Sequence, residues 1–162
     1  REYECNFISV MPTNLYGPND NFDLESSHVI PALLRKFIEA KNNEIPYVKV
    51  WGTGKPKREF LHVDDLADAC VYLFKKVDAK KLYNDGLSHI NVGSGNDIKI
   101  SELAEQVKEI VGYSGDIIYD SNMPDGTMRK LLDNSYLRNL NWQPKIGLKD
   151  GLKSTHDWFL KN

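Results

Sequence analysis

The part of the chain best suited to chemistry follows a short apolar run near its start. Residues 7–10 (FISV) have the composition of a buried strand, and Pro12, Gly17 and Pro18 then interrupt regular structure. Residues 13–21 are therefore predicted to form a loop that leaves a strand end. Because ligands bind at strand ends in α/β sheets, this loop is a candidate binding segment.

Two later side chains could serve acid–base chemistry and anion binding. His28 stands where a helix is expected to start, and the helix dipole there disfavours imidazolium, which makes a charged His28 a readier proton donor. Arg58 begins a predicted strand, and its guanidinium suits bidentate phosphate binding. A lone histidine at a helix start is usually a surface or cap residue, and Arg58 could be a solvated charge. Neither residue defines a site by itself.

Strands and helices are predicted to alternate, which places the chain in the α/β class. Strands are expected at residues 48–51, 58–63, 89–92 and 117–119. Helices are expected after a cap at Ser26 or Ser27, after a cap at Asp64 or Asp65, at 101–111, near 135–140 and near 148–160. The second of these helices has a predicted apolar face of Leu66, Ala69, Cys70, Leu73, Phe74 and Val77.

Composition bounds the class of protein. The chain has 162 residues, enough for one domain with a substantial core. Its formal net charge of −2 argues against nucleic acid or an anionic membrane as the main partner. No apolar run approaches the roughly 20 residues that span a bilayer. The two cysteines lack metal-ligand spacing, so we expect a reducing compartment, the cytoplasm, and no metal site.

Five segments together resemble one group of enzymes. They are MPTNLYGPNDN from Met11, SSHVIPALLRKF from Ser26, VWGTGKPKREFLHVDDLA from Val50, SHINVGSG from Ser88 and PDGTMRKLLD from Pro124. The chain resembles the GDP-L-fucose synthases, which belong to the extended short-chain dehydrogenase/reductase family. The resemblance covers nearly the whole chain and implies the C-terminal part of a Rossmann-like α/β enzyme, mainly its smaller substrate-binding domain.

The resemblance implies a reaction in two steps on GDP-4-keto-6-deoxymannose. The ketone acidifies the C3 and C5 protons, so that a base and an acid can invert both centres. NADPH then delivers hydride to C4. The implied partner is a GDP-sugar, and the full-length enzyme is expected to be a homodimer whose interface lies mostly upstream of this chain.

The resemblance also assigns roles to individual residues. His28 is expected to be the catalytic acid in epimerisation. The implied cofactor-binding residues, at the nicotinamide end of NADPH, are Pro12, Thr13, Asn14, Leu15 and His28. The implied substrate-binding residues are Lys36, Trp51, Arg58 and Asp125, with Arg129 and Lys130 as weaker candidates for the diphosphate. The family's base is a cysteine that matches neither Cys5 nor Cys70. We expect His62, Asp64 and Asp65 to be structural.

Two features of the family are absent from the sequence. No Gly-rich cofactor loop is present, and Tyr72 and Lys76, though spaced like the catalytic Tyr/Lys pair, follow the loop that they should precede. We therefore expect residues 1–20 to end a Rossmann domain that begins upstream, and residues 21–162 to form a substrate-binding region, with the strand near 88–92 returning to the Rossmann sheet. The isolated chain is expected to be inactive. Two alternatives stay open: another nucleotide-sugar epimerase or reductase, and a non-catalytic binding fragment.

Overall fold

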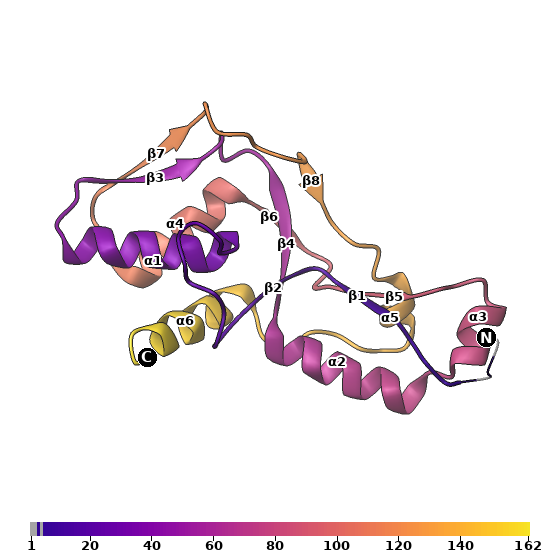
Figure 1. The fold of residues 1–162 in the computed structure, drawn as a ribbon. Helices are drawn as coiled ribbons and strands as arrows, with labels where there is room; N and C mark the ends of the chain where they lie inside the picture. Colours follow the sequence, from indigo (N-terminus) through magenta and orange to yellow (C-terminus); the bar gives the residue numbers. More distant parts are fainter. Residues whose placement is uncertain (1–2, 4) are drawn as a thin grey trace.

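Helices and strands alternate along most of the chain (Figure 1). The computed structural model describes residue 3 and residues 5–162, so Arg1, Glu2 and Glu4 of the predicted 1–20 segment lie outside the described residues. The helices are α1 (Val29–Asn42), α2 (Val63–Lys76), α3 (Ala79–Asn84), α4 (Ile100–Val111), α5 (Ser135–Asn139) and α6 (Leu148–Phe159). The strands are β1 (Val10–Pro12), β2 (Asn14–Tyr16), β3 (Tyr47–Trp51), β4 (Lys57–His62), β5 (Ile90–Val92), β6 (Asp97–Lys99), β7 (Asp116–Asp120) and β8 (Arg129–Lys130).

Most strand pairs are parallel and join segments far apart in the sequence. β1 pairs with β5, and β3 pairs with β7, both in parallel. β4 is the centre of the largest group, parallel to β2 and β8 and antiparallel to β6. Parallel strands need long crossover connections, usually helical, which is why they accompany alternating elements. The α/β class predicted from the sequence is confirmed.

Two clusters of buried apolar side chains meet at β4. The first packs α1 and α4 against β3, with Leu34 at its centre, and the second packs α2 against β5, with Leu73 at its centre. Successive residues of a strand point to opposite faces. Phe60 accordingly belongs to the first cluster and Leu61 to the second. β4 therefore runs between the two packed regions and links them (Figure 1).

The beginning of the chain differs from the prediction. The strand lies at β1 rather than at residues 7–10, and Phe7 is 75% exposed. The predicted loop at residues 13–21 contains β2, in which Asn14 lies opposite Phe60 of β4. The prediction was wrong because the partner that makes this short segment a strand is distant in the sequence. The pairing of β1 with β5 is the contact that a returning strand near 88–92 would make.

Two helix starts also differ from the prediction. His28 is the N-cap of α1, without a side-chain capping bond, in place of Ser26 or Ser27. His62 is the N-cap of α2, and its Nδ1 accepts a hydrogen bond of 3.2 Å from the Asp64 N–H. Asp65 lies in the first turn of α2. Its buried carboxylate accepts hydrogen bonds from the main-chain N–H groups of residues 145 and 146 instead of capping the helix.

Helix α2 has one buried side and one apolar exposed side. Ala69 and Leu73 are buried as expected, but Phe74 is 85% exposed and Cys70 is only half-buried. Val71 is exposed on the same helix. The apolar residues of α2 span a wider arc of the helix than the part that is buried. Part of the predicted apolar face therefore packs against nothing among the described residues. Within those residues, no helix is both long and apolar enough to cross a membrane.

Candidate functional site

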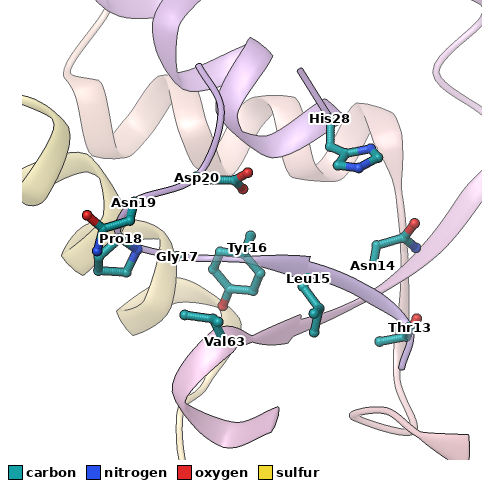
Figure 2. Close-up of a pocket in the computed structure, with 10 residues that line it drawn as sticks. All are labelled: Thr13, Asn14, Leu15, Tyr16, Gly17, Pro18, Asn19, Asp20, His28 and Val63. Carbon is teal, nitrogen blue, oxygen red and sulfur yellow. The ribbon is translucent and has the colours of Figure 1, made fainter. Parts of the chain in front are cut away.

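A cavity of about 420 Å³ lies where β2 ends (Figure 2). Residues 13–20, His28 and Val63 line it. The lining therefore unites most of the predicted cofactor-binding residues with the predicted catalytic histidine. Pro12 is the exception: it lies in β1, opposite Val92 of β5, and borders the cavity only through its neighbour Thr13.

Thr13 and Asn14 are held by a single main-chain oxygen. The Thr13 hydroxyl donates to the carbonyl of Glu59 at 3.2 Å, and the Asn14 Nδ2 donates to the same carbonyl at 2.8 Å. The Thr13 N–H donates to the carbonyl of Val92 at 3.0 Å. With its amide nitrogen engaged, Asn14 keeps its Oδ1 for an incoming hydrogen-bond donor. Leu15 supplies apolar lining beside them.

His28 enters the cavity from a different element, the start of α1 (Figure 2). Its backbone is extended, and its ring makes no capping hydrogen bond to the helix. The imidazole is exposed, so it is available to a ligand in the cavity. A histidine in this position can pass a proton to or from a bound molecule.

A closely packed layer lies beneath the cavity. Gly17 has φ +151°, and a Cβ there would stand 2.7 Å from Val63 Cγ1 and 3.4 Å from His62 Nε2, so only glycine fits. His62 is 3% exposed and stacks edge-on against Tyr16 with ring centroids 5.4 Å apart. Burial, with the charges of Asp65 and Asp150, raises the pKa of Tyr16 above its ordinary value. Tyr16, Gly17 and Val63 also line the cavity, whereas the buried His62 is not among its lining residues.

Lys36 and Trp51 border a second cavity, of about 220 Å³. The Lys36 ammonium lies 5.2 Å from the centroid of the Trp51 indole, within the range of a cation–π interaction. Partial burial lowers the pKa of Lys36. Trp51 is 57% exposed, so this strand tryptophan is not a core residue. An aromatic face beside a cation can receive a flat, anionic ligand.

Arg58 and Asp125 come together near the Gly52–Thr53 turn, where Arg58 contacts the Asp125 carbonyl and Thr53 contacts the Asp125 carboxylate. The Asp125 carboxylate accepts hydrogen bonds from the Thr53 N–H at 2.6 Å and the Thr53 hydroxyl at 2.7 Å, which lowers the pKa of Asp125. The Arg58 guanidinium donates to the carbonyl oxygens of Thr127 and Asp125. Both side chains thus help to hold the loop that contains Asp125 and Thr127. Asp125 in particular has its carboxylate engaged by Thr53 rather than free.

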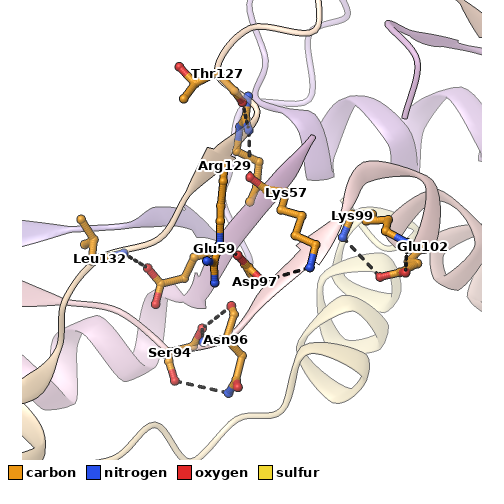
Figure 3. Close-up of polar contacts among 11 residues, drawn as sticks. Lys57, Glu59, Ser94, Asn96, Asp97, Lys99, Glu102, Thr127, Arg129 and Leu132 are labelled. Atoms are coloured by element: carbon orange, nitrogen blue, oxygen red, sulfur yellow. Dashed lines mark hydrogen bonds and ion pairs between the residues drawn. The ribbon is translucent and has the colours of Figure 1, made fainter. Parts of the chain in front are cut away.

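The predicted site residues therefore fall into neighbouring groups. The first group lines the larger cavity, and the second, Lys36 and Trp51, lines the smaller one. The start of α1 joins these two groups, since His28 lines the larger cavity while Ser27 and Val29 on either side line the smaller one. Thr53, two residues after Trp51, joins the smaller cavity to Asp125. Arg129 does not join them, because its guanidinium pairs with Asp97 of β6 (Figure 3).

Glu59 was missed by the sequence analysis although it contacts the candidate site directly. It is completely buried in β4, between basic and apolar neighbours. An acid inside a predicted buried strand was the available signal, because a carboxylate is rarely fully buried without partners.

Tyr72 was rejected from the sequence as a catalytic residue. In the structure its hydroxyl donates a hydrogen bond to the Leu140 carbonyl. No cluster of metal-ligating side chains is present among the described residues.

Alternating strands and helices, mostly parallel strand pairing and a cavity at a strand end are typical of Rossmann-like α/β proteins. Residues 1–93 match the NAD dependent epimerase/dehydratase family, and the chain belongs to that family. It is 59% identical to GDP-L-fucose synthase 1 of Arabidopsis thaliana over 96% of its own length and 46% of the relative. The resemblance to fucose synthases is confirmed, and the chain spans about half the length of the curated relatives it matches.

Solved structures give the same picture. A GDP-6-OMe-4-keto-L-xylo-heptose reductase from C. jejuni matches with a TM-score of 0.90 and 39% identity, over 99% of this chain and 55% of the other. A GDP-L-fucose synthetase from Naegleria fowleri bound to NADP matches with a TM-score of 0.85 and 30% identity, over 96% of this chain and 47% of the other. The predicted Rossmann-like fold is confirmed.

Proposed function

We propose that this chain forms the sugar-nucleotide half of a GDP-L-fucose synthase, an enzyme that epimerises GDP-4-keto-6-deoxymannose at C3 and C5 and then reduces C4. The observation that carries the proposal is the junction at the start of α1. There, His28 lines one cavity and its immediate neighbours line the cavity that holds Lys36 and Trp51. The similarity to fucose synthases over nearly the whole chain supports the same substrate.

The larger cavity fits the nicotinamide end of NADPH. It offers the Oδ1 of Asn14 as an acceptor for a carboxamide N–H and the Leu15 side chain as an apolar surface, both at a strand end. When bound, NADPH supplies the hydride for the reduction at C4. Pro12 would set the start of this segment, and His28 would border the cofactor and the sugar together.

Each remaining residue has a defined task in the proposal. A base from the other half removes the C–H proton that the ketone has acidified, and His28 then gives a proton to the same carbon from the opposite face. Trp51 packs on the nucleotide, and Lys36 places a positive charge beside it. Arg58 of β4 and Asp125 of the loop after β7 contact the GDP-sugar together, and the guanidinium can exchange a carbonyl contact for a phosphate oxygen.

The exposed surface of the described residues supports a division between two halves. Residues 1–20 would end the Rossmann domain, residues 21–162 would form the substrate-binding region, and β5 would return to the Rossmann sheet. β1 pairs only with β5 among the described strands, and Met11 is 51% exposed. Parallel sheets are normally covered on both faces. The second half of the sheet, with the Gly-rich loop and the Tyr/Lys pair, would therefore be required for activity.

The complete enzyme is proposed to be a cytoplasmic homodimer whose interface lies mainly in the other half. The two free cysteines, Cys5 and Cys70, agree with a reducing compartment.

A second candidate is a related reductase or epimerase of another nucleotide sugar. The close structural match to the C. jejuni heptose reductase favours keeping it. Turnover of GDP-4-keto-6-deoxymannose, compared with a GDP-4-keto-heptose and with UDP- and dTDP-sugars, separates the two. The assay needs this chain joined to the preceding half of the Arabidopsis relative, so that both sides of the site are present.

Calorimetry on the isolated chain tests its role as the sugar-nucleotide half. GDP is expected to bind, whereas NADPH is expected to bind very weakly because the phosphate-cradling helix start is in the other half. Micromolar affinity for NADPH, or no measurable binding of GDP, would overturn this assignment.

A further inference from the structure

Glu59 is a fully buried carboxylate that the proposed reaction does not use. Its Oε1 accepts hydrogen bonds from the Gly95 N–H at 2.6 Å and from Asn134 Nδ2 at 3.3 Å. Its Oε2 accepts one from the Leu132 N–H at 3.1 Å, drawn in Figure 3. These donors come from the turn after β5 and from the segment before α5. One side chain of β4 therefore holds two separate loops.

The same residue also holds the candidate cofactor segment. The main-chain carbonyl of Glu59 accepts the hydrogen bonds of the Thr13 hydroxyl and the Asn14 amide nitrogen. The Asn14 bond lies beside the pairing of Asn14 with Phe60 in the β2–β4 register. Any displacement of the backbone at residue 59 thus moves the Asn14 amide, which borders the larger cavity.

The charge of Glu59 is balanced by N–H donors. The nearby cations have other partners. Lys57 and Arg129 both pair with Asp97 (Figure 3). Arg58 donates to main-chain carbonyls. No ion pair to Glu59 is present among the described residues. A buried carboxylate is stable only when such donors replace its water.

The turn after β5 fits closely over this carboxylate. A Cβ on Gly93 would stand 2.4 Å from Glu59 Oε1, so a side chain at position 93 would have to displace the carboxylate. Its position is therefore determined from both sides, by Gly93 packing on it and by the donors around it.

We propose that Glu59 is a positioning residue for the cofactor side of the site, acting through its main-chain carbonyl on Thr13 and Asn14. The inference rests on the proposed function for the role of Asn14, but the contact itself does not. Glu59→Gln keeps the shape of the side chain and replaces one acceptor oxygen by an NH₂ donor. That donor must face another donor, which displaces β4 at residue 59.

Amide NMR and hydrogen exchange on this chain test the contact directly. Glu59→Gln is expected to reduce the protection of the Gly95 and Leu132 amides by roughly tenfold or more, as for loss of a charged hydrogen bond. The side-chain NH₂ resonances of Asn14 should shift as well. The exposed Glu105→Gln is the matched control and should leave all three unchanged. Asn14 resonances that stay in place in Glu59→Gln would overturn the proposal.

Kinetics of the chain joined to the preceding half of the Arabidopsis relative test the positioning role. Glu59→Gln should raise the KM for NADPH by about tenfold while changing the KM for the GDP-sugar by about twofold or less. Glu59→Asp, which retains the charge, should recover part of the loss. Equal effects on both KM values would indicate general destabilisation and contradict the proposal.

Two further outcomes are distinguishable. An inactive wild-type joined chain would contradict the proposed function, while the NMR experiment would still decide the contact. If Glu59→Gln does not fold, Gly93→Ala replaces it, because its added methyl pushes on the carboxylate without altering charge. The same displacement of the Asn14 resonances is then expected, and its absence would overturn the proposal.

Discussion

The ammonium of Lys36 lies 5.2 Å above the indole ring of Trp51, and both border one cavity. The arrangement is open on the solvent side, since Trp51 is 57% exposed. An exposed aromatic side chain beside a cation contributes little to folding and much to binding a flat anion.

Trp51→Ala is expected to weaken GDP binding by about tenfold, because stacking of an aromatic ring on a base is worth roughly 1–3 kcal/mol. Folding stability should change little. Tyr47→Ala on the same strand is the matched control, since Tyr47 is 45% exposed and lies outside the cavity lining. Calorimetry with GDP measures the effect, and equal losses in the two variants would place the nucleotide elsewhere.

GDP affinity should also depend on pH through Lys36. Because burial lowers the pKa of Lys36, the affinity should begin to fall at a lower pH than it would with a lysine of ordinary pKa.

Arg58→Ala should raise the KM for the GDP-sugar by about tenfold or more, with a smaller effect on kcat, because a charged hydrogen bond to phosphate is lost. The measurement requires the joined two-half chain. Arg138→Ala, an exposed arginine in a different cavity, serves as the control. A KM unaffected by Arg58→Ala would limit Arg58 to its structural contacts with the Thr127 and Asp125 carbonyls.

His28→Asn should slow proton exchange at C3 and C5 by about a hundredfold or more, the usual contribution of a general acid. GDP affinity should be retained, because His28 lines the larger cavity, whereas the proposed nucleotide contacts Lys36 and Trp51 line the smaller one. Deuterium incorporation from heavy water into the substrate reports epimerisation separately from reduction. His89→Asn, an exposed histidine outside both cavities, is the control. Exchange at the wild-type rate in His28→Asn would remove His28 from the mechanism.

Thr53→Val should raise the pKa of Asp125 toward the ordinary value near ~3.9, because the Thr53 hydroxyl and N–H are the main causes of its depression. A carboxyl group with a depressed folded-state pKa stabilises the fold above its unfolded pKa, and the contribution is lost as the pH falls through the folded value. The stability difference between wild type and Thr53→Val should therefore be present at neutral pH and shrink below about pH 4.

Unfolding curves across that pH range measure the difference. Thr127→Val is the control, because only the main-chain carbonyl of Thr127 takes part in the loop. A difference that grows on acidification would contradict the assignment of the Asp125 shift to Thr53.

Asp65→Asn should destabilise the chain by about 1.5–3 kcal/mol, as expected for charged hydrogen bonds in a buried position. The Asp65 carboxylate is 2% exposed and accepts the Lys145 and Ile146 N–H groups at 3.0 Å each. The asparagine NH₂ would face one of those donors. Denaturant unfolding gives the free energy, with the neighbouring exposed Asp64→Asn as the control. Equal stabilities for the two variants would show that the C-terminal segment does not depend on Asp65.

Much of the fold could be predicted from local sequence. β3, β4, α4 and α6 lie close to their predicted positions, because each has its own apolar periodicity and its own turn or cap residues. α4 ends at Gly112, which has φ +68°, as the glycine signal indicates. By contrast β2, β6 and β8 are two or three residues long, too short for periodicity to identify.

The sequence by itself determined which residue types are available for chemistry, and the resemblance of its motifs placed His28, Lys36, Trp51, Arg58 and Asp125 in one site. Only the tertiary structure decided how these side chains are held. The Asp125 carboxylate accepts a hydrogen bond from Thr53, 72 residues away. Glu59 accepts hydrogen bonds from Asn14, 45 residues before it, and from Leu132, 73 residues after it. Such partners leave no local pattern. A buried carboxylate must find donors wherever the fold brings main-chain N–H groups close, and that placement exists only after β4 has paired with its neighbours.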